Sequence, residues 1–355
     1  MTLRQRTLGK EMVLKEIETL LNISKYPEDL FGWTATRAEA AKIFKRYKHL
    51  THEDKFGDDE KALAHDLFIK LGNLWEIAVQ RFKDGTYGDK TSKVVEFEHS
   101  ITSKKKTYNI VTSFSTANLC NVYATDSGEV LKVARTHKDN DLLKREAEVF
   151  KKFNDIETDI IQRTTPKLIE TFEVRSLKKE KIRVNVTNNF ESYIPLSQVK
   201  EAYPDGIHGR HIIWIWKRIL MTLGFAHKIN VIHGCLNLDN IIIDPKDHSV
   251  AIVDWCYSVD SGENLVLIDS KYKGYYTKEV FDKKPVDSDL DIYMSAKCIE
   301  DLIGPDCPTI LKNLIKSALI PNKSMRYSDS WDLYNHVSDT AKKVYGEPKF
   351  IELKI

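Results

Sequence analysis

Residues 231–244 read VIHGCLNLDNIIID, and residues 250–257 read VAIVDWCY. Asn240 stands directly before one run of branched apolar residues, and Asp254 stands directly after another. Short apolar runs of this kind predict buried strands. A polar side chain beside a buried strand needs a partner, and a divalent cation is one that an amide oxygen and a carboxylate can share. The stretch therefore predicts Asn240 and Asp254 as metal ligands.

This stretch resembles the catalytic segment of protein kinases, whose signature is H-R-D-L-x-x-x-N followed by D-F-G. His233 aligns with the histidine, Asn240 with the asparagine, and Asp254 with the aspartate of D-F-G. The resemblance implies ATP and Mg²⁺ as cofactors, with Asn240 and Asp254 in the nucleotide site as the metal ligands. It also implies a structural role for His233, because this histidine mostly packs in the core of kinases.

Residues upstream of this stretch match a further kinase motif. Residues 130–133 read VLKV in the place of V-A-I-K, so Lys132 aligns with the lysine that pairs with the ATP phosphates. Glu146 lies fourteen residues after Lys132. We expect Glu146 at the beginning of a helix, as the ion-pair partner of Lys132 in the nucleotide site.

Residues downstream continue the resemblance in the same order. Glu279 aligns with the glutamate of A-P-E, and Arg326 aligns with the arginine that usually pairs with it. Asp291 lies between them in DLDIYMSAK. All three are predicted to be structural residues. Residues 107–346 thus resemble the protein-kinase fold, which has a β-rich N-lobe and a helical C-lobe.

Several positions depart from the kinase pattern. Cys235 occupies the place of the catalytic aspartate, and Asn237 occupies that of a lysine that meets the γ-phosphate. In the segment that aligns with the glycine-rich loop, the three glycines are replaced by Ser115, Ala117 and Cys120. Backbone amides at Ser115 and Ala117 are still predicted to reach the nucleotide, but without the close approach that glycine permits.

The missing aspartate weighs against efficient catalysis. General-base catalysis contributes about 10²–10⁴-fold to a rate, and a thiol of ordinary pKa is mostly protonated at neutral pH. The sequence therefore predicts an ATP-binding regulatory protein of kinase-like fold, a pseudokinase in which Cys235 is inactive. Three alternatives stay open: an active atypical Ser/Thr protein kinase, a scaffold that binds no nucleotide, and a small-molecule phosphotransferase. The last is suggested because enzymes of the aminoglycoside-kinase type often carry H-G-D-x-x-x-x-N followed by I-D-W. Residues 233–240 (HGCLNLDN) and 253–255 (VDW) resemble these two motifs.

The first ninety residues are predicted to be helical. Apolar residues recur at three- and four-residue steps, and Thr36 with Glu39 forms a capping-box pattern at the beginning of one run. That run is basic and is followed by the tripeptide His-Glu-Asp at residues 52–54 and by a long helical pattern over residues 58–82. The segment thus has a basic helix, a polar loop and a long third helix.

This arrangement resembles the J-domain of the DnaJ co-chaperone family, in which a basic second helix and an H-P-D loop bind a DnaK-type chaperone. Glu53 replaces the proline, which is expected to leave the loop less rigid and binding weaker. The alternative is a chance H-x-D after an ordinary basic amphipathic helix. The predicted partner-binding residues are Lys45, Arg46, Lys48, His52, Glu53 and Asp54.

Residues 94–97, 108–114, 121–125 and 130–134 alternate or run β-branched and aromatic, which predicts strands, and residues 126–128 are expected to form a hairpin turn. After about residue 205 the chain is predicted to be mostly helical. The whole chain is therefore predicted to be α+β, with four segments. These are an N-terminal helix (1–20), a J-domain-like helical domain (21–90), a kinase-like N-lobe (91–190) and a kinase-like C-lobe (191–355). The fusion resembles a bacterial and phage group of DnaJ-like proteins that carry kinase-like regions.

Composition restricts the compartment and the partners. The formal net charge is only +2, so no global field attracts nucleic acid or an acidic membrane. The five cysteines are odd in number and show no CxxC spacing, which indicates a reducing compartment. We therefore expect a cytoplasmic protein that binds a DnaK-type chaperone and possible protein clients, but no membrane and no nucleic acid.

Overall fold

The computed structural model describes residues 14–21, 24, 26–52, 55–83, 87–88, 100–116, 120–175, 180–190 and 192–355. The chain divides into two compact units, with the boundary between Glu96 and Phe97. Each unit has hydrophobic core residues of its own, and each is described here by itself.

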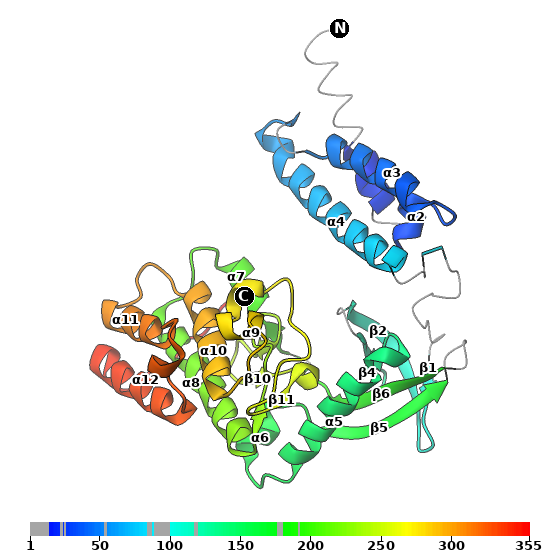
Figure 1. Ribbon diagram of the computed structural model, residues 1–355. Helices are drawn as coiled ribbons and strands as arrows, with labels where there is room; N and C mark the ends of the chain where they lie inside the picture. The colour runs from blue at the N-terminus through cyan, green and yellow to red at the C-terminus, as the bar shows by residue number, and fades with distance from the viewer. Residues whose placement is uncertain are drawn as a thin grey trace. The chain divides into compact units, whose positions relative to one another are not determined.

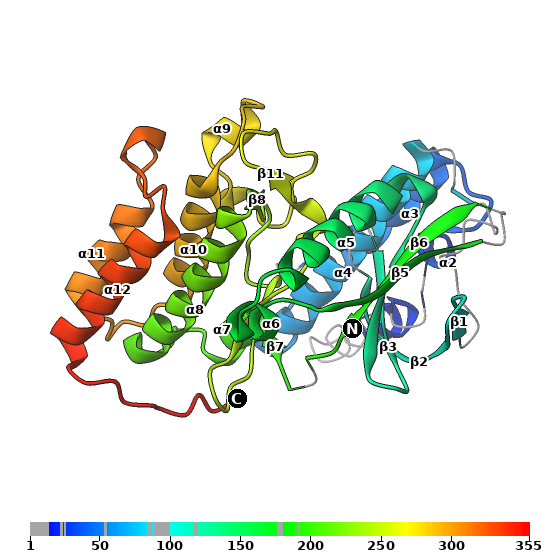
Figure 2. The same ribbon diagram turned by 90° about the horizontal axis from the view of Figure 1, so that it is seen from below.

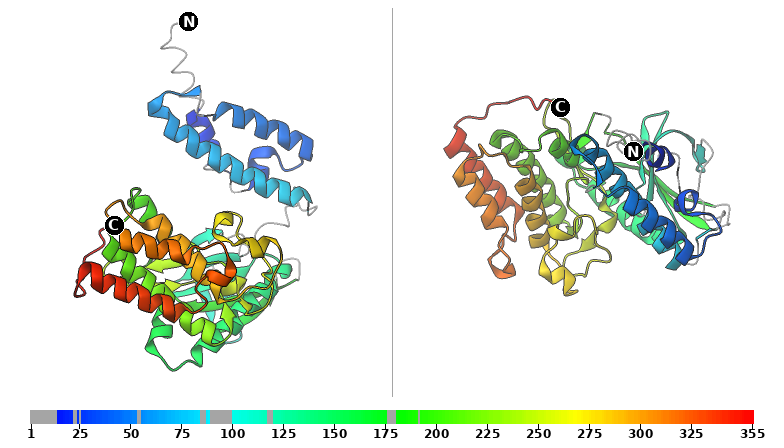
Figure 3. Two further views of the ribbon diagram at one scale, coloured as in Figure 1. Left: turned by 60° about the vertical axis from the view of Figure 1, so that its left-hand side comes forward. Right: turned by 90° about the horizontal axis from the view of Figure 1, so that it is seen from above.

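The first unit is helical across most of its described residues. Residues 14–21 form a short helix, followed by α2 (Pro27–Phe31), α3 (Arg37–Leu50) and α4 (Asp58–Lys83) (Figure 1). Helices α3 and α4 pack side by side, as the two views in Figure 3 show. The helices share one core, which includes Leu14, Ile17, Phe31, Ala40, Leu67 and Leu71. The predicted helical character of this segment is confirmed for its described residues.

Helix α3 begins at the predicted capping box. Thr36 Oγ1 accepts a hydrogen bond from the backbone N–H of Glu39 at 3.3 Å. In return, Glu39 Oε2 accepts one from the backbone N–H of Thr36 at 2.8 Å, and this bond is the main reason that the pKa of Glu39 is lowered. Both bonds satisfy donors that have no partner within a helix, which fixes where α3 starts.

A buried ion pair connects α2 to α4. Glu28 is completely buried, and Arg81 Nη1 donates to its two carboxylate oxygens at 2.6 and 2.7 Å. The backbone N–H of Gly88 also donates to Glu28 Oε1, at 3.3 Å. A buried carboxylate is costly unless it is paired and hydrogen-bonded. The packing of these two helices therefore depends on Arg81.

The second unit begins with a six-stranded antiparallel sheet in the order β1-β2-β3-β4-β6-β5. Its strands are β1 (Ser100–Thr102), β2 (Thr107–Thr116), β3 (Cys120–Thr125), β4 (Glu129–Ala134), β5 (Leu168–Arg175) and β6 (Lys181–Asn188). The predicted hairpin turn at residues 126–128 joins β3 to β4, and Gly128 has a φ of 81° there. Helix α5 (Asn140–Asn154) packs on this sheet, as Figure 2 shows.

The rest of the second unit is mostly helical, as predicted for residues after about 205. Helix α8 (Gly209–Lys228) packs against α10 (Ser288–Leu302) and α12 (Ser330–Tyr345) (Figure 2). Trp216 of α8 is completely buried, and its Nε1 donates to Ser295 Oγ of α10 at 3.1 Å. The other helices are α6 (Asp159–Thr164), α7 (Leu196–Ala202), α9 (Lys278–Phe281) and α11 (Thr309–Ala318).

Two small antiparallel sheets hold the loops that carry the candidate site. Strand β9 (Ile241–Ile243) pairs with β10 (Val250–Ile252) and with β7 (Ile194–Pro195). Strand β8 (Val231–Ile232) pairs with β11 (Val259–Asp260). The loop 233–240 therefore joins β8 to β9, and the loop 253–258 joins β10 to β11.

The structure establishes an α+β chain with a curled antiparallel sheet followed by helices. One expectation is wrong: Glu146 does not begin a helix. Helix α5 already starts at Asn140, directly after a 3-10 turn (His137–Asp139) that begins at a capping box of Thr136 and Asp139. The strand expected at residues 94–97 lies outside the described residues. In the described part of the chain, no helix has the length and apolar character needed to cross a bilayer.

Candidate functional site

Lys132, Glu146 and Asp254 come together from three separate elements of the second unit. Lys132 projects from β4, and its Nζ donates to Glu146 Oε1 of α5 at 2.6 Å. The same ammonium donates to Asp254 Oδ1, in the loop after β10. The predicted Lys132–Glu146 ion pair is therefore present. The additional pairing of Lys132 with Asp254 was not predicted.

The charges in this cluster stabilise one another. Burial alone would disfavour the charged lysine, but the carboxylates of Asp254 and Glu146 hold the pKa of Lys132 well above its usual range. Burial would likewise raise the pKa of Asp254, yet the Lys132 ammonium lowers it. The cluster thus carries one cation and two carboxylates, which leaves an excess of negative charge beside the lysine.

A buried asparagine of the sheet orients Glu146. Asn185, on β6, is completely buried, and its Nδ2 donates to Glu146 Oε2 at 3.1 Å and to the Leu143 carbonyl at 2.8 Å. One carboxylate oxygen of Glu146 therefore faces Lys132 and the other faces Asn185. Sequence reasoning missed Asn185, because the alternation in IRVNV places it with Arg183 on the face of the strand that is expected to be polar.

Asp291 of α10 holds the beginning of the loop 233–240. Its carboxylate accepts hydrogen bonds from the backbone N–H groups of His233 and Gly234, at 2.8 and 2.9 Å. It also contacts His227 Nε2 at 2.9 Å. Gly234 has a φ of 71°, a conformation that residues other than glycine seldom adopt. Asp291 was predicted to be structural, and these contacts are of that kind.

His233 lies in the core beneath the loop. It is completely buried, and burial lowers its pKa. Its Nε2 lies 2.9 Å from the carbonyl oxygen of Val253, while its Nδ1 accepts from the backbone N–H of Cys235 at 3.2 Å. The neutral imidazole therefore donates from Nε2 and ties the loop 233–240 to the residue before Asp254.

Cys235, at the position of the kinase base, is buried among polar groups. Asn240 Nδ2 and Asn237 Nδ2 lie 3.6 and 3.7 Å from its Sγ, and Tyr276 Oη donates to it at 3.5 Å. Burial and then the negative charge of Asp254 raise the pKa of the Cys235 thiol. The thiol is therefore neutral at physiological pH, and it cannot accept a proton from a hydroxyl group.

Asn240 and Asp254 lie at the same end of the β9–β10 ladder. The backbone N–H of Val253 donates to the Asn240 carbonyl at 2.9 Å, just beyond the pairing of Ile241 with Ile252. The Asn240 side-chain nitrogen donates to the Cys235 carbonyl at 2.9 Å, which leaves the side-chain oxygen as the atom that a cation would meet.

Asp254 combines two features that suit a functional position. Its backbone is left-handed, with φ 68° and ψ 45°, which is uncommon for a residue other than glycine or asparagine. It also belongs to a group of three side chains that each offer one atom able to ligate a metal, namely Asp254, Glu146 and Cys256. These three atoms lie within 4.8 Å of one another. Lys132 pairs with both carboxylates and neutralises part of this charge.

Each thiol of the chain is buried. Burial raises the pKa of Cys120 to about 12 and that of Cys256 well above its usual range. Cys256 Sγ donates to Asp254 Oδ1 at 3.2 Å. These thiols act as weak neutral donors or apolar groups, and none is positioned as a nucleophile.

The other predicted residues of the second unit are the pair Glu279 and Arg326, and Ser115 and Ala117 of the segment that aligns with the glycine-rich loop. Arg326 Nη2 contacts Glu279 Oε2 at 3.1 Å, as predicted, and Arg326 Nη1 also pairs with Asp289 at 2.9 Å. Ser115 lies in β2, paired with Val122. Ala117 lies outside the described residues.

The predicted partner-binding residues lie in the first unit. Lys45, Arg46 and Lys48 are exposed on α3, and His52 is exposed just after it. Lys48 Nζ lies 5.4 Å from the ring centroid of Phe68, on α4. Glu53 and Asp54 lie outside the described residues.

Comparison with known proteins adds no family assignment. No protein-family model matches the chain, and no curated protein shows significant sequence similarity to it.

Proposed function

We propose that the second unit is a kinase-like, two-lobed module that binds ATP with Mg²⁺ and transfers phosphate slowly or not at all. We propose further that the first unit is a J-like module that recruits a DnaK-type chaperone. The observation that carries the nucleotide part is the cluster of Lys132, Glu146 and Asp254. The protein would then act as a regulator whose nucleotide state is coupled to chaperone recruitment.

The cluster suits a nucleotide better than it suits fold stability. A buried lysine between two carboxylates is expensive to desolvate, and apolar residues would stabilise a fold at least as well. Lys132 can meet ATP phosphates, while Asp254 and the Asn240 oxygen would hold a Mg²⁺ ion that bridges those phosphates. Glu146, fixed by Asn185, keeps Lys132 in place.

Mg²⁺-ATP at a hundredfold excess over its Kd is expected to stabilise the second unit by about 2.7 kcal/mol. Asp254→Asn should remove the Mg²⁺-dependent part of this gain, because a neutral amide holds the cation less strongly. Urea unfolding with ATP, with Mg²⁺ and with both measures the effect for each protein against its own ligand-free state. Glu300→Gln, on an exposed position of α10, should keep the full gain. Unchanged stability of the wild type at millimolar ATP would contradict nucleotide binding.

Cys235→Asp is expected to increase the rate of phosphate transfer by about 10²-fold or more, because it supplies a carboxylate in place of a neutral thiol. The amides of Asn237 and Asn240 and the Tyr276 hydroxyl are already placed to hydrogen-bond to such a carboxylate. Autophosphorylation with labelled ATP measures the rate, and Cys235→Asn is the matched variant that should gain nothing. Rapid transfer by the wild type that disappears in Cys235→Ala would show that the thiol does act in catalysis.

An active phosphotransferase is the second candidate function, and Asp269 is the residue that favours it. Tyr276 Oη accepts from the backbone N–H of Asp269 at 2.9 Å and donates to Cys235 Sγ, so Asp269 lies close to the position of the missing base. Burial, followed by the charges of Asp239 and Asp254, raises the pKa of Asp269, which suits a general base. Wild-type transfer that is lost in Asp269→Asn would support this function over the first.

Neutralising the exposed cations of α3 is expected to weaken binding to a DnaK-type chaperone by at least tenfold. Lys45→Gln/Arg46→Gln removes two charges from an exposed helix surface, and binding by such a surface should also weaken as salt rises. The measurement is stimulation of the chaperone's ATPase, at low and high salt. Lys61→Gln, an exposed lysine of α4, is the control. If the wild type neither binds nor stimulates at low salt, the J-like assignment fails.

A further inference from the structure

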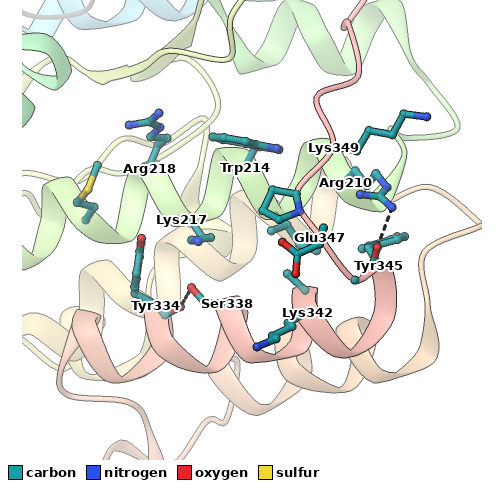
Figure 4. Close-up of a pocket in the computed structure, with 15 residues that line it drawn as sticks. Arg210, Trp214, Lys217, Arg218, Tyr334, Ser338, Lys342, Tyr345, Glu347 and Lys349 are labelled. Carbon is teal, nitrogen blue, oxygen red and sulfur yellow. Dashed lines mark hydrogen bonds between the residues drawn. The ribbon is translucent and has the colours of Figure 1, made fainter.

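A cavity of about 470 Å³ lies in the second unit between α8, α12 and the chain that follows α12. Figure 4 shows its lining, with Lys217 of α8 beside Tyr334 of α12, Arg210 beside Tyr345, and Trp214 and Arg218 farther from α12. It shares no residue with the cluster around Lys132. Its volume is within the range of pockets that bind small organic molecules.

The lining of this cavity is strongly cationic. Its five cations are Arg210, Lys217, Arg218, Lys342 and Lys349, and its single acidic residue is Glu347. Within the described part of the chain, none of these five has a carboxylate within 4.0 Å. Arg210, Lys217 and Arg218 are half-buried, whereas Lys342 and Lys349 are exposed. The cavity thus collects positive charge that no ion pair in the described structure neutralises.

Aromatic rings hold three of these cations in place. Lys217 Nζ lies 4.8 Å from the centroid of Tyr334, and the Arg218 guanidinium lies 5.7 Å from that of Trp214. The Arg210 guanidinium lies 4.6 Å from the centroid of Tyr345, and its Nη2 donates to the Tyr345 carbonyl at 3.0 Å. The face of an aromatic ring attracts a cation through the cation's charge and accepts no hydrogen bond of ordinary strength. Most N–H donors of such a cation therefore stay available to a ligand.

The apolar part of the lining indicates that the ligand has an apolar part as well as a charged one. Ile213, Met221, Ala341 and Pro348 contribute carbon surface between the cations. Phosphate monoesters carry close to two negative charges at neutral pH and accept hydrogen bonds from planar guanidinium groups and from ammonium groups. We propose that this cavity binds a small organic phosphate, with the phosphate between the α8 and α12 cations and the organic part against the apolar surface.

Phenyl phosphate is the probe that tests this site, because it has one phosphate and one small apolar body. Titration calorimetry of the full chain at low salt should show saturable binding of one molecule. Lys217→Gln/Arg218→Gln should weaken this binding at least tenfold. Lys228→Gln, at an exposed position in the last turn of α8 and outside the cavity, should leave it unchanged.

Ser338→Asp gives a second variant for the same question. Ser338 lines the cavity from α12, so a carboxylate there would neutralise the cations and compete with the ligand. The Ser338→Asp variant should not bind phenyl phosphate, and this result can be obtained even if the Lys217→Gln/Arg218→Gln variant folds poorly.

Three results would overturn the proposal. The first is the absence of binding at millimolar phenyl phosphate, including the case in which only an acidic or phosphorylated peptide binds. The second is unchanged binding in the double variant and in Ser338→Asp. The third is equal affinity for inorganic phosphate and phenyl phosphate, since the apolar part of the cavity would then contribute nothing.

Discussion

Replacing Asp291 by alanine is expected to lower the free energy of unfolding of the second unit by about 3–5 kcal/mol. Asp291 is completely buried, and the substitution would leave the backbone N–H groups of His233 and Gly234 without an acceptor. Each buried donor without a partner costs about 1–3 kcal/mol. His227 would lose the partner of its Nε2 as well, while its Nδ1 keeps Ser330. Urea unfolding followed by circular dichroism measures the loss.

The pH dependence of this loss has a definite sign. The pKa of Asp291 is lowered in the folded protein: burial would raise it, but the hydrogen bond and charge of His227 outweigh burial. A lowered pKa contributes stability that is fully present above about pH 4, the range of an unfolded aspartate, and that is lost as pH falls through the folded pKa. The difference between wild type and variant should therefore shrink in acid.

Glu300→Gln on the same helix is the matched control for Asp291. Glu300 is exposed and, among the residues that the structure describes, pairs with Lys297 alone, three residues earlier, so its loss should cost less than about 0.5 kcal/mol. A loss for Asp291→Ala as small as that of the control would contradict the structural role of Asp291. It would mean that water replaces the carboxylate at the loop 233–240.

Replacing Arg81 by methionine is expected to destabilise the first unit by about 3–5 kcal/mol, because it leaves Glu28 charged and buried without its partner. A loss of this size is a large part of the stability of a small unit. Thermal unfolding of the full chain should then show an early transition that belongs to this unit. The transition of the second unit should keep its midpoint.

The double variant Glu28→Gln/Arg81→Met separates lost charge from lost packing. Glutamine keeps an acceptor for the backbone N–H of Gly88 but carries no charge, so more than half of the lost stability should return. If the double variant is as unstable as Arg81→Met, the arginine stabilises this unit by its contacts with other residues. The Arg81 guanidinium lies over the ring of Tyr26, at 5.7 Å, so that contact would then be examined next.

Local patterns in the sequence predicted much of the secondary structure because they depend on nearby residues. The capping box at Thr36 and the hairpin turn ending at Gly128 each need only a few neighbouring residues. The beginning of the helix that carries Glu146 is also marked locally, by the capping box of Thr136 and Asp139 at the 3-10 turn that leads into α5. The pairing of Glu146 with Lys132 gives no information on where that helix starts.

The candidate site was predictable only where residues match the kinase motifs in the right order. Lys132 and Glu146 were expected from that resemblance, and they pair in the structure. The roles of Asn185 and Tyr276 depend on contacts across long sequence separations, namely with Glu146 and with Cys235. The sequence contains the residues of such contacts, but only the folded chain brings them together.

The burial of every thiol makes chemical modification a selective reporter. All five cysteines lie between residues 120 and 307, so the second unit holds all of them and the first holds none. Alkylation by iodoacetamide therefore requires the second unit to open, and its rate measures that opening alone. Mass spectrometry of the labelled peptides would then distinguish opening near Cys235 from opening near Cys307, while the first unit stays silent throughout.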